Sequence, residues 1–150
     1  MSVRIVQSVE VLASAEVCWR SFSELADWPR WFASLTAVER TMQGPFVVGE
    51  LLVLGLAFRG HGSRVTVRVA SVVDGHEVRW VGSSFGVRGD HAFRVDPMDA
   101  TRARFTSDET FTGFPTRLIP RRIFAELEAE VAAGLQRFAR LVAEKGETQS

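Results

Sequence analysis

The feature that most constrains the fold is a series of short segments with alternating apolar and polar residues, followed by one long segment of helical periodicity. Residues 63–73 show the alternation most clearly, because valines occupy every second position from 65 to 69. The dipeptide Asp74-Gly75 follows them and favours a tight hairpin turn. The pattern therefore predicts an antiparallel sheet whose strands follow one another in hairpins.

Strands are expected along most of the chain, in a sheet of six or seven. The predicted ranges are 3–12, 36–42, 50–58, 63–73, 76–84, 86–95 and 101–111, with the last two joined across turn residues 96–100. Short connections between most of these ranges leave no room for crossover helices, so neighbouring strands are expected to pair directly.

The last long segment, residues 120–145, predicts a single amphipathic helix. Proline is favourable in a first helical turn, and Pro120 stands there. Apolar residues recur every three or four positions and form one stripe; they are Phe124, Leu127, Val131, Leu135, Phe138 and Val142. This helix alone is long enough to cover one face of the sheet, so the predicted fold class is α+β.

Between the first two strands we expect two short helices, or a helix and a turn. Ser14 is a suitable N-cap, and Pro29 interrupts the helical pattern. Trp28, Trp31 and Phe32 surround this proline, and we expect them to close one end of the sheet and helix. A turn broken by proline is not expected to point both tryptophans inward, and Trp31 is predicted to pack inward with Phe32.

The composition is that of one ordinary soluble domain. The chain has 150 residues, 46% of them hydrophobic and 24% charged, and its formal net charge is zero. A zero net charge gives no reason to expect electrostatic capture of nucleic acid or of an acidic membrane. We expect one domain at 1–145 and a flexible tail at 146–150, and we leave a homodimer open.

The sequence predicts a cytoplasmic protein without stable membrane insertion. No run approaches the 18 apolar residues of a membrane span, and the first residues lack the long apolar stretch of a signal peptide. The single cysteine, Cys18, cannot form an internal disulfide and fits a reducing compartment. It is expected to be a small buried packing residue rather than a nucleophile.

Together these segments resemble the helix-grip, START-like superfamily, and more narrowly its polyketide cyclase/dehydrase-like branch (SRPBCC proteins). The opening VEVLASAEVCWRSFSELADWPRWFASLTAVE is similar to that branch in its strand, its small-residue helix start and its Asp-Trp…Trp segment. Gly49-Glu50, the Asp74-Gly75 hairpin, HAFRVDPMDATRARFTSDETFTG and the C-terminal helix also match. The resemblance covers nearly the whole chain, and its motifs are architectural.

The resemblance implies a curved antiparallel sheet wrapped round the long helix, with a deep apolar cavity between them. Some members of the branch cyclise or aromatise polyketides, and others bind or carry lipids, quinones or hormones. The implied partner is therefore a hydrophobic small molecule. Since a fold does not by itself give a function, the side chains that line the cavity must decide between these roles.

Strand alternation places two titratable residues on the inner face of the sheet. His91 shares its face with Phe93, and Glu109 shares its face with Ser107. His91 is either an acid or base for a ligand, or a neutral histidine bonded within the core. Glu109 is a general base, an acceptor for a ligand hydroxyl, or a residue that reaches water or pairs with an arginine. No third partner for a hydrolytic triad is recognisable.

Charged residues in and before the long helix give further candidates. Glu128 lies near the edge of the apolar stripe, where it faces the cavity, lies at the seam between helix and sheet, or is a solvated flank residue. Arg117, Arg121 and Arg122 surround Pro120 at the entry to the helix. They either bind an anionic head group or are solvated surface residues.

Large apolar residues complete the predicted ligand-binding set. Phe85 and Phe114 stand in glycine-bearing loops, where they are predicted to cover the pocket as a lid. The other candidates are wall residues unless they belong to the core: Trp31, Trp80, Phe93, Phe105, Phe111, Phe124, Leu127 and Val131, with the polar Ser107 beside them. No cofactor is expected, and the histidines do not share the spacing of metal ligands.

Two main functions remain open. The first is a binding protein that holds a polyketide, lipid or isoprenoid-like molecule without changing it. The second is an enzyme of the cyclase, aromatase or dehydratase kind, in which Glu109 or His91 removes a proton alpha to a carbonyl. A regulatory or protein-interaction role, as in the similar Hsp90-activator-like branch, is the third.

Overall fold

The computed structural model describes residues 2–148 of the chain. Its elements, in chain order, are β1 (Ser2–Val11), α1 (Ala15–Phe22), η1 (Leu25–Asp27), α2 (Trp28–Trp31), β2 (Leu35–Arg40), β3 (Leu51–Phe58), β4 (His61–Val73), β5 (Glu77–Ser84), β6 (Val87–Asp99), β7 (Arg102–Thr112), η2 (Phe114–Leu118) and α3 (Arg121–Thr148). The predicted α+β class and order of elements are confirmed.

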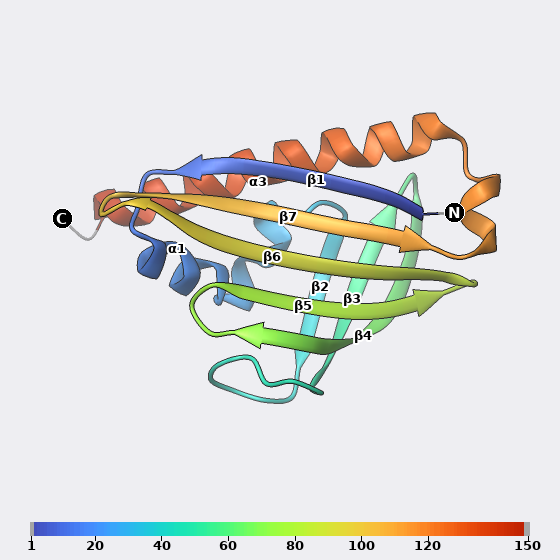
Figure 1. Cartoon of the computed structure of the whole chain (residues 1–150), viewed down its shortest axis with the longest axis horizontal. Helices are drawn as coiled ribbons and strands as arrows, with labels where there is room; N and C mark the ends of the chain where they lie inside the picture. The colour runs from blue at the N-terminus through green and yellow to red at the C-terminus, as the bar shows by residue number, and fades with distance from the viewer. Residues whose placement is uncertain (1, 149–150) are drawn as a thin grey trace.

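Within these residues, seven strands form one antiparallel sheet in the order β1-β7-β6-β5-β4-β3-β2. Strands β2 to β7 pair with their neighbours in sequence, and β1 pairs with β7. Figure 1 shows the sheet curling, so that β2 and β3 cross the view steeply while β1 and β7 run beside α3. The sheet and the long helix therefore form the two layers of a helix-grip fold.

The apolar stripe of α3 has different surroundings along its length. Leu135, Phe138 and Val142 in the second half are buried against the core, whereas Leu127 and Val131 in the first half are only partly buried. Phe138 packs on Phe105 of β7 and on Trp31 of α2, with ring centroids 4.3 and 5.0 Å apart. The second half of α3 thus anchors the helix, and the first half spans a less filled region.

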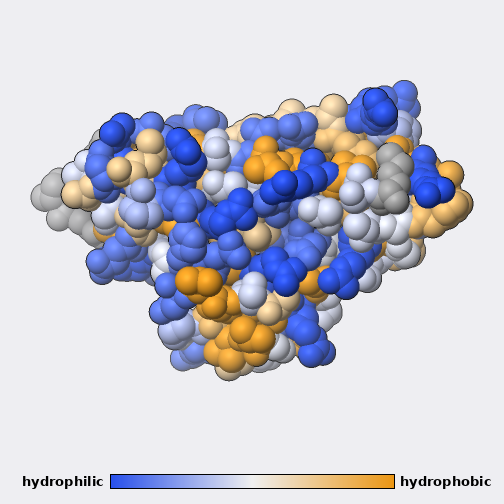
Figure 2. All heavy atoms as spheres, in the orientation of Figure 1, coloured by the Kyte–Doolittle hydropathy of each residue, from blue (hydrophilic) through white to orange (hydrophobic). Residues whose placement is uncertain are grey.

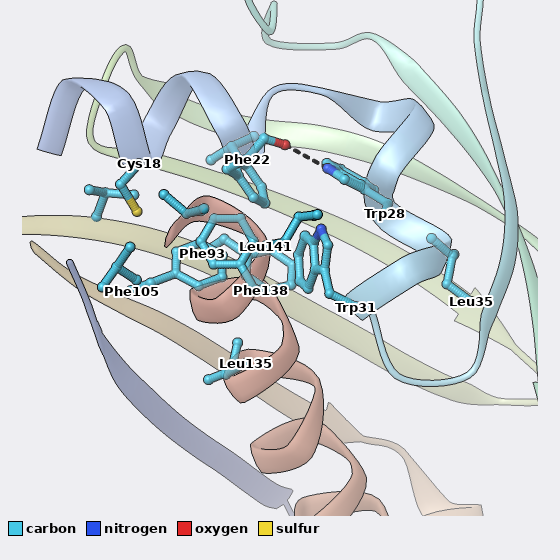
Figure 3. Close-up of a cluster of buried hydrophobic side chains, with 14 of the residues drawn as sticks. Cys18, Phe22, Trp28, Trp31, Leu35, Phe93, Phe105, Leu135, Phe138 and Leu141 are labelled. Carbon is cyan, nitrogen blue, oxygen red and sulfur yellow. Dashed lines mark hydrogen bonds between the residues drawn. The ribbon is translucent and has the colours of Figure 1, made fainter. Parts of the chain in front are cut away.

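Trp28 and Trp31 both point into the core, which corrects the prediction that only one of them would do so (Figure 3). Pro29 lies in the first turn of α2, where no backbone N–H donor is needed, so it starts this turn instead of breaking it. Residues three apart then share one face of the turn. The Trp28 indole Nε1 donates a hydrogen bond to the backbone oxygen of Phe22, at 2.6 Å.

The largest differences from the predicted element boundaries are at the ends of β6 and α3. Strand β6 continues through the expected turn to Asp99, with a register shift between Pro97 and Asp99. A bulge tolerates Pro97, which has no N–H to donate to a ladder. Helix α3 continues to Thr148, so the predicted tail is helical over 146–148, and residues 149–150 lie outside the described part.

The loop between β2 and β3 is held by a buried ion pair. Both carboxylate oxygens of Glu50 accept hydrogen bonds from Arg40, at 2.6 and 3.0 Å, and one also accepts from the backbone N–H of Val47. The Arg40 guanidinium also lies 4.9 Å from the centre of the Phe46 ring. A bidentate pair with a further N–H donor satisfies a carboxylate that burial would otherwise destabilise. Glu50 of the Gly49-Glu50 motif therefore has a structural role.

The close approach of α3 to the Trp31 backbone gives a test of the packing. A methyl group added at Gly134 would overlap the backbone oxygen of Trp31. Gly134→Ala is therefore expected to lower the free energy of unfolding by about 1–3 kcal/mol, although alanine alone favours a helix by about 1 kcal/mol. Gly146→Ala, in the same helix with nothing within 4 Å, is the control and should not destabilise. Urea unfolding measures both; equal stabilisation would contradict the contact.

Cys18 is expected to be inert in the folded protein. Burial raises the pKa of its thiol to about 12 from an ordinary value of 9.0. A chromogenic aromatic disulfide, which reacts with accessible thiols, should therefore leave Cys18 unmodified in the native protein at pH 8. It should react with Cys18 once urea unfolds the chain. Burial favours the neutral thiol, so the folded pKa is the higher one. The contribution of Cys18 to the free energy of unfolding is therefore fully present below pH 9 and is lost as the pH rises towards 12. Cys18→Ala should remove that part of the pH dependence; rapid labelling of the native protein would contradict this.

Candidate functional site

A cavity of about 280 Å³ lies between the curved sheet and the first half of α3. Its polar wall residues are Ser34, His61, Ser63, His91 and Glu109, and its apolar side chains are Phe32, Ala33, Leu54, Leu56, Phe58, Val67, Trp80, Phe111 and Leu127. An apolar wall with a few polar groups is typical of small-molecule sites, and this volume is at the small end of their range of about 300–1,000 Å³.

Two facing glycines line this cavity. Gly82 of β5 and Gly89 of β6 pair directly across the ladder and both line the cavity. They lie two residues from Trp80 and His91, so they have the inward parity of those side chains. A Cβ atom built at Gly89 would meet its nearest neighbours at 3.9 Å, an ordinary van der Waals distance, whereas one built at Gly82 would lie 2.7 Å from a methyl group of Val67.

A narrower recess of about 40 Å³ adjoins the cavity. Phe32, Ala33, His91, Glu109 and Leu127 line both spaces, so they form the passage between them. The recess is further lined by Trp31, Phe93, Ser107, Val131, Gly134 and Leu135. The buried Trp31 Nε1 has no hydrogen-bond partner within residues 2–148, so apolar packing alone fixes that ring.

His91, Ser107 and Glu109 form one polar chain at the passage. His91 Nε2 lies 2.8 Å from Ser107 Oγ, and His91 Nδ1 lies 3.3 Å from Glu109 Oε2. The carboxylate favours a proton on Nδ1, which leaves Nε2 to accept a hydrogen bond from the serine hydroxyl. Ser107 is thus a third polar member of this group, joined to the pair through His91.

Within the Ser107–His91–Glu109 group, the carboxylate is the member most accessible from the cavity, and the serine hydroxyl is turned away from it. Ser107 is 2% exposed and lines the recess but not the cavity. The Glu109 side chain is 21% exposed and lines both spaces. His91 is packed between rings of Phe93, Trp80 and Phe32, with centroids 4.2, 5.5 and 5.7 Å away. Such apolar surroundings strengthen the electrostatic interaction between imidazole and carboxylate. Glu109 is thus the member that can meet a ligand.

Other predicted wall residues also lie on the cavity or the recess. Trp80, Phe111 and Leu127 line the cavity, and Trp31, Phe93, Ser107, Leu127 and Val131 line the recess. Phe105 instead belongs to the core behind the recess, where it is fully buried. Phe124 packs on Phe111 with ring centroids 5.9 Å apart and does not line either space.

The remaining candidates lie on the surface. Glu128 is exposed and accepts a hydrogen bond from Gln7 of β1 at 2.9 Å, so it flanks the seam between helix and sheet. Phe85 and Phe114 do not line the cavity and are exposed to solvent, so they form no lid in this structure. Arg117 and Arg121 are also exposed, and Arg117 borders a shallow hollow beside Thr112.

Several cavity residues were missed from the sequence. Leu54 and Leu56 belong to β3, a continuous apolar run in which alternation does not reveal the inner face. His61 lies between the predicted strands 50–58 and 63–73, but it is the first residue of β4 and lines the cavity. The signal that could have found the site is the pair Gly82 and Gly89, which stand where alternation expects inward side chains.

A cluster of charged residues lies on the opposite face of the sheet. Arg4 and Arg94 both donate to Asp108, at 2.7 and 3.2 Å, and the Arg4 hydrogen bond is the main reason that the pKa of Asp108 is lowered. Within residues 2–148 no group of three or more His, Cys, Asp and Glu residues could hold a metal ion. No helix in the same range is long and apolar enough to cross a membrane.

A family model described as "Polyketide cyclase / dehydrase and lipid transport" matches residues 2–143. The fold is similar to the Zhui aromatase/cyclase from Streptomyces sp. R1128, with 17% identity, a TM-score of 0.75 and coverage of 97% of this chain and 96% of that one. It is also similar to a START superfamily protein from Mycobacterium smegmatis (16%, TM-score 0.70, coverage 92% and 98%).

A third similar structure is norcoclaurine synthase from Thalictrum flavum in complex with dopamine and hydroxybenzaldehyde (18%, TM-score 0.65, coverage 96% and 88%). At these identities the structural likeness establishes a shared fold and no shared chemistry. No curated protein matches the chain in sequence.

Proposed function

The chain belongs to the polyketide cyclase/dehydrase and lipid transport family, and from this premise we propose that it binds a hydrophobic or aromatic small molecule between the sheet and α3. The observation that carries the proposal is the cavity of about 280 Å³, whose wall is mostly apolar and includes the contacting pair Glu109 and His91. Suitable ligands are polyketide, lipid or isoprenoid-like molecules.

The cavity supports such a ligand through two kinds of contact. Burial of apolar ligand surface against Leu54, Leu56 and Trp80 supplies the main driving force, about 25 cal/mol per Å² removed from water. The Glu109 carboxylate keeps free lone pairs beyond its contact with His91, so it accepts a hydrogen bond from a ligand hydroxyl or enol. The ligand's polar end therefore lies at the passage to the recess.

The second candidate is an enzyme of the cyclase, aromatase or dehydratase kind, favoured by the Ser107–His91–Glu109 chain. Glu109 takes a proton from the carbon alpha to a ligand carbonyl, and an enolate forms. In a dehydration, the β-hydroxyl then leaves with the proton that Glu109 returns, as water. His91 stays in place and holds the carboxylate in position.

Filling the cavity tests the binding proposal. The space in front of Gly89 accepts a side chain without a backbone clash, so Gly89→Val should place two methyl groups inside the cavity. The affinity for a neutral naphthylamine dye, measured by fluorescence, should fall at least about ten-fold, a loss of about 1.4 kcal/mol. Native mass spectrometry should show that any molecule retained by the wild-type protein is lost.

The control for this variant is Gly62→Val. It adds the same side chain in β4 at a position outside the cavity, where a Cβ meets only the backbone oxygen of Leu56, at 3.9 Å. Dye binding should be unchanged. If both variants bind as the wild type does, the dye lies elsewhere and the cavity is not the binding site.

Glu109→Gln separates binding from catalysis. The substitution keeps the size of the side chain and removes the base, so an enzyme should lose roughly 10²–10⁴-fold in single-turnover rate on a thioester-linked polyketide analogue while still binding it. Glu128→Gln removes the same charge from the surface and should retain the rate. Absence of turnover in the wild-type protein, together with intact dye binding in Glu109→Gln, would leave the binding function alone.

A further inference from the structure

One end of the molecule exposes three large apolar side chains. Phe85 in the β5–β6 turn is 93% exposed, and Phe114 and Leu118 in η2 are 69% and 72% exposed. The two segments are in contact, because a Cβ added at Gly86 would lie 3.3 Å from the ring of Pro115. We call these three residues the apolar tip. Figure 1 places the β5–β6 turn and η2 at the same end, and Figure 2 shows apolar surface there.

The backbone at Phe85 is unusual for such a residue. Phe85 and Gly86 have φ angles of 51° and 79° and form the two-residue turn between β5 and β6. Asparagine, aspartate or glycine normally occupies the first of these positions, since a bulky side chain in the left-handed region is strained. Phe85 makes no compensating packing contact, because it is almost fully exposed. Strain that serves no packing is typical of functional positions.

Unpaired cations surround the apolar tip. Arg117, Arg121 and Arg122 are exposed, and within residues 2–148 none of them has a hydrogen bond or ion pair. The segments 84–89 and 113–125, which form this end, contain no acidic residue. The zero net charge of the whole chain therefore conceals a locally cationic end.

We propose that this end is a reversible docking surface for an anionic lipid bilayer. Phe85, Phe114 and Leu118 enter the interface, while the three arginines bind lipid phosphates. The exposed apolar side chains match the apolar interior of a bilayer, and the unpaired arginines beside them match its anionic phosphates, so a single lipid surface accounts for both features. Docking of this kind is peripheral and needs no spanning helix.

The docking surface adjoins the cavity. Gly89 and Phe111 line the cavity, and each lies within three residues of a segment that carries the apolar tip. A docked bilayer would thus face that end of the cavity. The proposal does not depend on the proposed function, because vesicle binding is measured without any cavity ligand.

Vesicle co-sedimentation tests the proposal. The wild-type protein should bind vesicles of phosphatidylcholine mixed with phosphatidylglycerol, and added salt should weaken this binding. It should bind vesicles of phosphatidylcholine alone more weakly. Phe85→Asn, which suits the turn geometry, should lower binding at least about five-fold through loss of apolar contact. Arg121→Gln and Arg122→Gln should each lower it roughly five-fold.

Two controls change equivalent residues elsewhere. Val48→Ser removes an exposed apolar side chain from the β2–β3 loop, and Arg104→Gln removes an exposed, unpaired arginine near the start of β7. Both should bind vesicles as the wild type does. If the controls lose as much binding as the tip variants, or if the wild type binds no vesicles, the proposal is wrong.

A second measurement reports insertion directly. In Phe85→Trp, brominated lipids should quench the new indole, whereas they should leave the buried Trp28 and Trp31 unquenched. An unquenched indole in a vesicle-bound protein would place the bilayer on another surface. Sedimentation velocity without vesicles tests whether a second copy of the chain binds the apolar tip instead. A dimer that Phe85→Asn dissociates would assign the tip to a second copy of the chain and overturn the proposal.

Discussion

The contact between Gly134 of α3 and the backbone of Trp31 determines where the long helix meets the rest of the molecule. On the C-terminal side of Gly134, Leu135 and Phe138 pack into the aromatic core. On its N-terminal side, the helix spans the cavity. The first half is tied down by polar contacts at its flanks, from Glu126 to Arg59 and from Glu130 to Ser34. Exposed ion pairs contribute about 0–1 kcal/mol each, so this half is held far less firmly than the buried half.

The same sheet supplies a filled end and an empty end from residues of one parity. Along β6 the inward positions run from Gly89 through His91 to Phe93, which is an increase from no side chain to a ring packed against Phe105 at 5.6 Å. The inward side chains of β6 therefore increase in size from the cavity towards the filled core. His91 lies between Gly89 and Phe93 in this series, with Glu109 beside it, and both residues therefore line the cavity and the recess.

Alternation and helical periodicity were sufficient to predict the strands, their antiparallel order and the stripe of α3, because these patterns are local. They also gave the inward parity of His91, Ser107 and Glu109. The chain that joins these residues depends on the register between β6 and β7, which no single segment contains. Likewise, the inward position of both Trp28 and Trp31 depends on Pro29 starting a helical turn, and the burial of Phe105 depends on where α3 crosses the sheet.

The position of the polar pair constrains any ligand, whether or not it reacts. Because Glu109 and His91 lie at the passage to the recess, a ligand whose polar end points inward places that end against the carboxylate. A molecule taken from a docked bilayer would have its headgroup nearest the protein, so it would enter in this orientation without turning round. The Glu109–His91 pair inside the cavity and the apolar, cationic surface outside it are therefore consistent with each other.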